Sequence, residues 1–231
     1  MRLGGDDPDV RAAIAASSTL AAAVGVFGIS FGVGAVDAGA SVWQACAMSL
    51  LVFTGASQFS ATTVVGAGGT TGAALGGALL LAARNAVYGL AMARIIRGRL
   101  ATRLLAAQLT IDESTAMATA QRHPHAQRVA FWVTGGGTYV VWNLGTLVGA
   151  LAGGAINPET FGLDAAFPAA YVAMLWPHLR TPVGRLAAGL GAVICLVLTP
   201  ITPVGLPILA AATVILLGLR TPHRSPAVDS A

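Results

Sequence analysis

The chain has 231 residues, of which 55% are apolar and only 10% are charged, with a net charge of +4. Soluble domains carry about 25% charged residues, so this sequence is too apolar to build a water-facing surface. That excludes an ordinary soluble enzyme or nucleic-acid-binding protein, and the high hydrophobicity excludes an intrinsically disordered chain. The composition indicates an all-α fold, a polytopic helical membrane protein surrounded by the lipid bilayer.

About seven membrane-spanning helices are expected, because each needs about 20 mainly apolar residues. The apolar stretches cover approximately residues 14–36, 42–65, 71–96, 129–153, 161–179, 183–199 and 206–219. Together they predict a single transmembrane domain over residues 1–221, followed by a disordered polar tail over residues 222–231. The interruption at about 97–128 holds five of the 13 arginines and is predicted to be a cytoplasmic segment.

Arginine placement predicts how the chain is oriented. Arginines follow the third and fifth stretches and occur in the C-terminal tail, whereas the links after the second, fourth and sixth stretches have none. Because cytoplasmic loops are enriched in basic residues, we expect a cytoplasmic C-terminus and, for seven spans, an N-terminus outside. Arg2 and Arg11 favour the alternative, in which a re-entrant first or second segment puts the N-terminus inside. The segment 104–120 is also apolar enough to enter the membrane.

Two Gly-xxx-Gly pairs suggest an internal repeat. Gly28 and Gly32 lie in the first stretch, and Gly145 and Gly149 lie in the fourth. If three spans repeat as the next three, the second copy must be inverted, as in many secondary transporters. The prediction is then a 3+3 inverted repeat plus one C-terminal span. The alternative is close packing of helices, for which small residues at this spacing are also used.

The second stretch contains Phe53-Thr-Gly-Ala-Ser-Gln-Phe59. On a continuous helix Thr54, Ser57 and Gln58 share one face. A Gln amide is costly in hydrocarbon unless it is hydrogen-bonded. The patch is therefore a candidate site for a small polar head group, with interhelical hydrogen bonding as the alternative.

Arg84 lies in the third stretch, with Asn85 beside it and Tyr88 one turn later. An intramembrane arginine faces protein or a water-filled cavity, and its guanidinium suits a carboxylate. That carboxylate belongs either to a substrate or to a protein partner, for which Asp112 and Asp164 are the candidates.

Thr110-Ile-Asp-Glu113 fits a helix-capping box. Asp112 and Glu113 are also candidates for a cation or proton site that couples transport to an ion gradient. Asp164 opens the fifth stretch and is either interfacial or part of the same site. The sequence has no metal-ligand spacing and no phosphate-binding glycine loop, so we expect no metal, no other cofactor and no ATP-driven step.

Four motifs in order resemble the AzlC family, the large subunit of two-part branched-chain amino acid exporters. They are Gly28-Ile-Ser-Phe-Gly32, Phe53-Thr-Gly-Ala-Ser-Gln-Phe59, Ala83-Arg-Asn-Ala-Val-Tyr-Gly89 and Leu109-Thr-Ile-Asp-Glu-Ser114. The resemblance implies export of Leu, Ile or Val through a bacterial cytoplasmic membrane. It also implies a small hydrophobic partner subunit of the AzlD type.

The leading hypothesis is therefore a secondary exporter of branched-chain amino acids, in which Arg84, next to Asn85 and Tyr88, holds the substrate carboxylate and an acid faces the ammonium. Gly28 and Gly32 are also candidate substrate-binding residues, because the small-residue wall of the first stretch leaves room for a branched aliphatic side chain.

Two other classes are kept as alternatives. One is a passive subunit of a membrane assembly. The other is an intramembrane serine hydrolase that would use Ser57 with His178, a pair that needs to lie within hydrogen-bond reach.

Overall fold

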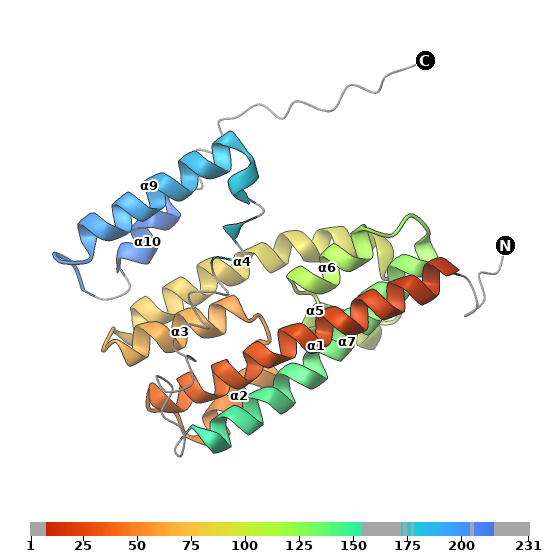
Figure 1. Ribbon diagram of the computed structural model, residues 1–231, viewed down its shortest axis with the longest axis horizontal. Coiled ribbons are helices and arrows are strands. Elements are labelled where there is room, and N and C mark those ends of the chain that lie inside the picture. The colour runs from red at the N-terminus through yellow and green to blue at the C-terminus, as the bar shows by residue number, and fades with distance from the viewer. Residues whose placement is uncertain (1–7, 154–171, 173–174, 177, 204–205, 215–231) are drawn as a thin grey trace.

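A computed structural model describes residues 8–153, 172, 175–176, 178–203 and 206–214, and all regular elements in these ranges are helical (Figure 1). The elements are α1 (Pro8–Asp37), α2 (Val42–Val52), α3 (Ala56–Gly66), α4 (Thr71–Ile95), α5 (Leu100–Gln108), α6 (Asp112–Thr119), α7 (Pro124–Ala152), η2 (His178–Arg180), α9 (Pro182–Leu198) and α10 (Leu206–Ala212). The predicted all-α class is confirmed for this part of the chain.

Four of the predicted spans correspond to continuous helices, namely α1, α4, α7 and α9. Among the described helices, α1 and α4 are long and apolar enough to cross a membrane, while α2 and α9 are shorter apolar helices. Most of the predicted fifth span (161–179), part of the seventh (206–219) and the tail (222–231) lie outside the described residues. A count of seven spans is therefore not established.

Helices α1 and α7 form the central pair of the fold, and their glycines let the two backbones touch. A Cβ added to Gly28 would lie 2.5 Å from the carbonyl oxygen of Trp142. A Cβ added to Gly149 would lie 2.1 Å from the carbonyl oxygen of Ile29. No side chain fits at these positions, so the Gly-xxx-Gly motifs serve close helix packing.

The same contacts show that α1 and α7 run in the same direction. Gly137 lies against Ala21, and Gly153, just after α7, lies against Val33, so residue numbers increase together along both helices (Figure 1). A repeat of three spans inverted in the membrane would make these two helices antiparallel. The predicted 3+3 inverted repeat is therefore wrong for this pair, and helix packing, the alternative interpretation, explains the glycines.

The predicted second span is a hairpin of two short helices rather than one crossing. The start of α2 and the end of α3 both lie beside the C-terminal end of α1, where Gln44 and Val65 line one pocket with Ala38. The tip of the hairpin reaches the middle of α7, because Gly55 faces the indole of Trp142. The second segment thus enters the helical bundle and returns to the same end.

The break between α2 and α3 depends on backbone conformations that a helix does not contain. Phe53 has a φ of 24° and Gly55 a φ of 58°, both in the left-handed region. Glycine adopts that region without the steric cost of a Cβ. The Gln58 side chain then replaces the lost helical hydrogen bonds, because it accepts from the Gly55 N–H at 3.1 Å and donates to the Met48 carbonyl at 3.1 Å.

A second hairpin, formed by α5 and α6, enters the bundle from the opposite end. Helix α5 folds back along α4, where Met92 and Ala107 line one pocket. The hairpin tip reaches the middle of α7, since a Cβ on Gly135 would lie 3.0 Å from the carbonyl oxygen of Leu109. Gln108 donates a hydrogen bond of 2.9 Å to the carbonyl of Leu50 at the end of α2. The interruption at 97–128 is therefore not a loop outside the helical bundle.

The two hairpins give the first six helices an inverted arrangement (Figure 1). Helix α1 is followed by a hairpin at its C-terminal end, and α4, which runs back, is followed by a hairpin at the opposite end. His123, just before α7, lies 3.9 Å from Asp9 at the start of α1. The start of α1 and the arginine-rich segment thus share one end of the bundle, in contrast to the predicted N-terminus on the opposite side.

Replacement of Gly145 by Ala tests the α1–α7 contact. The new Cβ would lie 2.6 Å from the carbonyl oxygen of Gly25, so the helices must separate. We expect a loss of about 1–3 kcal/mol of stability, measured as a lower unfolding temperature of the purified protein in detergent. Gly136→Ala on the same helix is the matched control, because nothing lies within 4 Å of its added Cβ. Equal unfolding temperatures for the two variants would contradict the contact.

Single cysteines test the shared end of the bundle. In a chain whose Cys46 and Cys195 are replaced by Ala, Asp9→Cys and Arg122→Cys should react with a membrane-impermeant maleimide from the same side of the membrane. Asp37→Cys, at the opposite end of α1, should react only from the other side. Labelling of Asp9→Cys and Arg122→Cys from opposite sides would show that the second segment crosses the membrane.

Candidate functional site

The two hairpin tips meet at a cavity of about 480 Å³ in the middle of the bundle. Its lining comes from α1, both hairpins, α4 and α7, and consists of Leu20, Val24, Phe27, Phe53, Thr54, Gly55, Ala56, Phe59, Arg84, Ile111, Asp112, Glu113, Thr138 and Trp142. The residues from α1 and α7 lie near the centres of these helices, about equally far from both ends. The cavity therefore lies about midway along the two central helices.

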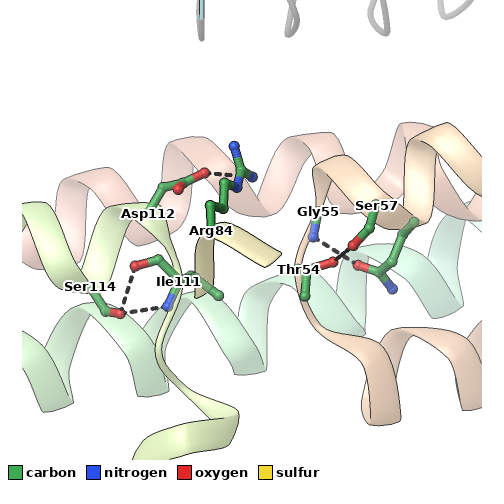
Figure 2. A network of polar contacts seen from close by, with 8 residues as sticks. Thr54, Gly55, Ser57, Arg84, Ile111, Asp112 and Ser114 are labelled. Carbon is green, nitrogen blue, oxygen red and sulfur yellow. Dashed lines mark hydrogen bonds and ion pairs between the residues drawn. The ribbon is translucent and has the colours of Figure 1, made fainter. Parts of the chain in front are cut away.

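Both hairpins direct a helix N-terminus to the cavity, and both use the same capping device (Figure 2). In the α3 break, the Gln58 side chain accepts from the Gly55 N–H. In the α6 break, the Ser114 hydroxyl accepts from the Ile111 N–H at 3.0 Å and donates to the Leu109 carbonyl at 2.7 Å. Helix N-termini carry partial positive charge, so the two tips create a polar centre that favours anionic groups.

Arg84 of α4 and Asp112 of α6 form an ion pair at the cavity wall, with 2.7 Å between Nη2 and Oδ2 (Figure 2). The side chains are 28% and 30% exposed. Of the two carboxylates predicted as partners of Arg84, Asp112 is the one the structure places there, and Asp164 lies outside the described residues. Asp112 is also the first residue of α6, where a negative charge is stabilised by the helix dipole.

The ion pair leaves polar atoms unused. Arg84 Nε and Asp112 Oδ1 are buried and have no hydrogen-bond partner in the described part of the chain. An unsatisfied buried polar atom costs about 1–3 kcal/mol, and more when it is charged. The pair therefore keeps a free donor and a free acceptor next to the cavity that Arg84 and Asp112 line. Glu113, the second acid predicted to act in coupling, lines the cavity as well.

The predicted polar face of Thr54, Ser57 and Gln58 does not exist as such, because the helix break falls between Thr54 and Ser57. The hydroxyls of Thr54 and Ser57 hydrogen-bond each other across the break (Figure 2). Ser57 and Gln58 are buried, and only Thr54 borders the cavity. Gln58 thus holds the hairpin together, which is the alternative role that the sequence left open.

Four further predicted site residues lie away from the cavity lining. Gly28 and Gly32 pack against α7, where a Cβ on Gly32 would lie 2.2 Å from the Thr146 carbonyl oxygen. Asn85 and Tyr88 are half-buried on α4 and do not line the cavity, but the Tyr88 hydroxyl lies beside the Asp112 carboxylate, which does. Arg84 is therefore the residue that α4 contributes to the lining.

Aromatic rings form much of the remaining wall, and sequence reasoning did not identify them as a group. The Phe59 ring meets the Trp142 indole edge-on, with centroids 5.7 Å apart and an interplanar angle of 70°. Phe53 meets Tyr139 in the same manner at 4.9 Å. Aromatic residues make up only 6% of the chain, so their concentration here is notable, but only the fold brings them together. The wall suits an apolar side chain.

The serine-hydrolase alternative gains no support from the structure. The hydroxyl of Ser57 is buried and hydrogen-bonded to the hydroxyl of Thr54, and the side chain of His178 is outside the described part of the chain. Among the residues searched, no three His, Cys, Asp or Glu side chains are grouped to hold a metal ion.

A double-mutant cycle tests the ion pair. Arg84→Gln leaves Asp112 without its cation, and Asp112→Asn leaves Arg84 without its anion, so each should cost about 3 kcal/mol of stability. The double variant should cost clearly less than the sum, because no charge is left unpaired. The readout is the unfolding temperature in detergent, and Arg94→Gln, an exposed arginine on the same helix, is the control. Strict additivity of the two single effects would contradict the pair.

The model of one protein family, described as AzlC protein, matches residues 19–156, which is more than half of the chain. The match spans α1 to α7 and includes the whole cavity lining. No curated protein and no solved structure matches the chain. The AzlC family is transport-related rather than enzymatic, is associated with branched-chain amino acid transport, and works with a partner subunit. With this match over both hairpins and the ion pair, the chain belongs to the AzlC family.

Proposed function

We propose that this protein is the large subunit of a secondary exporter that moves Leu, Ile or Val out of the cell across the bacterial cytoplasmic membrane. The observation that carries the proposal is the central cavity, which joins a charged pair and two helix N-termini to an aromatic and aliphatic wall. This combination matches a small zwitterion with an apolar side chain, and transport requires no chemical conversion of it.

The charged pair supplies the groups that a free amino acid needs. The guanidinium of Arg84 suits the substrate carboxylate, and the carboxylate of Asp112 suits the ammonium. In the structure the two side chains neutralise each other, with 2.7 Å between Nη2 and Oδ2. A bound zwitterion offers each of them a partner of opposite charge, so the net charge of the site does not change when substrate enters or leaves.

The apolar wall supports selection of a branched aliphatic side chain. Phe27, Phe53 and Phe59 border the cavity together with Leu20 and Val24. Burial of an aliphatic side chain against such a wall contributes about 1.5–3 kcal/mol. A charged side chain in the same position would lose its hydration without gaining a partner, which favours apolar amino acids over charged ones.

The two hairpins support a mechanism of alternating access. They enter from opposite ends of the bundle and border the cavity at residues 53–55 and 111–113, so each separates the cavity from one end. Movement of either hairpin away from its contacts would open one side only. Short broken helices around a central site are a recurrent design for such gating.

Energy coupling is proposed to use a proton carried by Asp112 or Glu113, both of which line the cavity. The sequence has no nucleotide-binding pattern, so an ion gradient is the available source of energy. Asp164 is a third candidate, outside the described residues. The arginine-rich end is proposed to face the cytoplasm together with the C-terminus. The partner is proposed to be a small hydrophobic subunit of the AzlD type.

Efflux from proteoliposomes that contain the chain and its partner subunit tests the proposed function. Proteoliposomes loaded with labelled leucine, isoleucine or valine should release the label faster than protein-free liposomes with the same load. Labelled lysine should be retained. Arg84→Ala should reduce efflux at least tenfold, because it removes the carboxylate ligand and leaves Asp112 unpaired. Arg94→Ala is the control for loss of an arginine elsewhere on α4. Unchanged leucine efflux in Arg84→Ala would contradict the assigned site.

Two further arms of the same assay address coupling and partner. A protonophore should abolish accumulation against a gradient, and Glu113→Gln should leave only downhill exchange. Asp112→Asn should also lose uphill transport, and it should weaken downhill exchange as well, because it removes the ammonium ligand and leaves Arg84 unpaired. Omission of the small subunit should abolish efflux. Uphill transport that persists in the presence of the protonophore would refute proton coupling, and full activity of the chain alone would refute the need for a partner.

A further inference from the structure

One face of α7 carries three polar side chains that are buried without partners. Thr134, Thr138 and Trp142 are spaced four residues apart, so they lie one above the other along the helix. Their side chains are 0%, 1% and 4% exposed. In the described part of the chain, neither threonine hydroxyl nor the indole N–H finds a hydrogen-bond partner. Each such group carries a free-energy cost that native structures usually avoid.

The cavity separates these three side chains into two groups. Thr138 and Trp142 line it, whereas Thr134, one turn nearer the start of α7, does not. Thr138 and Trp142 therefore carry unused donors on side chains that line the cavity. Thr134 provides an internal comparison, because it has the same helix face, the same burial and the same unpaired state without access to the cavity.

Packing fixes the position of the Trp142 indole independently of any hydrogen bond. The ring stacks on Phe31 with centroids 6.1 Å apart and an interplanar angle of 23°, and Phe59 meets its edge. The backbone of Trp142 is held by its close contact with Gly28. The N–H is thus directed by the surrounding core, and a donor fixed in advance loses little entropy when a ligand binds.

The chemistry of the two donors restricts what they can bind. An indole N–H donates and cannot accept a hydrogen bond, so it can pair with a carboxylate oxygen but not with an ammonium group. Arg84 is already paired with Asp112, so a carboxylate that enters the cavity competes for the guanidinium. The α7 donors face no such competitor.

We infer that the Thr138 hydroxyl and the Trp142 indole N–H bind the substrate carboxylate together with Arg84. The inference rests on the proposed function and extends it to two residues of α7. Because the carboxylate then lies against α7, the ammonium is directed to the side of Asp112, and the apolar side chain to the phenylalanine wall. The arrangement distinguishes an amino acid from an analogue that lacks the negative charge.

Equilibrium binding of tritiated leucine to the purified full chain together with its partner subunit in lipid nanodiscs tests this inference. Unlabelled leucine and leucinamide, in which a neutral amide replaces the carboxylate, serve as competitors. The wild-type protein should prefer leucine strongly. Thr138→Val, which removes the hydroxyl and keeps the shape, should weaken leucine binding about tenfold and reduce the preference over leucinamide. Trp142→Phe should act in the same direction while it keeps a ring in the aromatic wall.

Thr134→Val is the matched control and should leave both the affinity and the preference unchanged. An unaltered preference in Thr138→Val, or an equal loss in Thr134→Val, would overturn the inference and identify the polar face of α7 as a structural feature. Wild-type protein that binds no leucine at all would instead overturn the proposed function, and the inference with it.

Discussion

The need to satisfy every backbone polar group in a non-aqueous interior governs this fold. A helix that breaks at membrane depth exposes N–H and C=O groups, and such breaks persist only where protein atoms replace the lost hydrogen bonds. Gln58 does this at the first break and Ser114 at the second. Both breaks border the same cavity, where each exposes a helix N-terminus that favours anionic groups. These two N-termini depend on the amide of Gln58 and the hydroxyl of Ser114, which cap them.

The α1–α7 pair supplies the rigid frame against which these hairpins close. Contact between backbones at Gly28 and Gly149 leaves no room for a side chain, because carbonyl oxygens occupy the space of a missing Cβ. The pair also positions the site, since Trp142 is fixed by Gly28 behind it and by the rings of Phe31 and Phe59 around it. Helix packing and the cavity lining thus share Trp142, and a change at the glycine contact reaches the cavity through this residue.

Hydrophobic length alone predicted the long helices, because an apolar stretch of this size has few alternatives to a helix in lipid. It did not predict the hairpins, since residues 42–65 are apolar throughout and the break depends on the backbone at Phe53 and Gly55. Charge alone limited the candidate partners of Arg84 to Asp112 and Asp164, and the structure shows that Asp112 forms the ion pair. The sequence could not identify Thr138 as a residue of the cavity lining, because a threonine in an apolar helix has no distinctive pattern around it. Its place in the lining follows only from the fold.

The cavity lining is divided between two units of inverted arrangement, the first formed by α1, α2 and α3 and the second by α4, α5 and α6. Arg84 and Asp112 belong to α4 and α6, whereas Phe27, Phe53 and Phe59 belong to α1 and the α2–α3 hairpin. On the proposed function, the charged end of a substrate contacts the second unit and its side chain contacts the first. A ligand that bridges both units stabilises the state in which they are closest, because only there are both sets of contacts complete. A substrate with only one of the two chemical features would bind one unit and leave the equilibrium between states unchanged. On the same proposal, the amphipathic character of the cavity accounts both for selectivity and for the coupling of occupancy to gating, because the same contacts serve both.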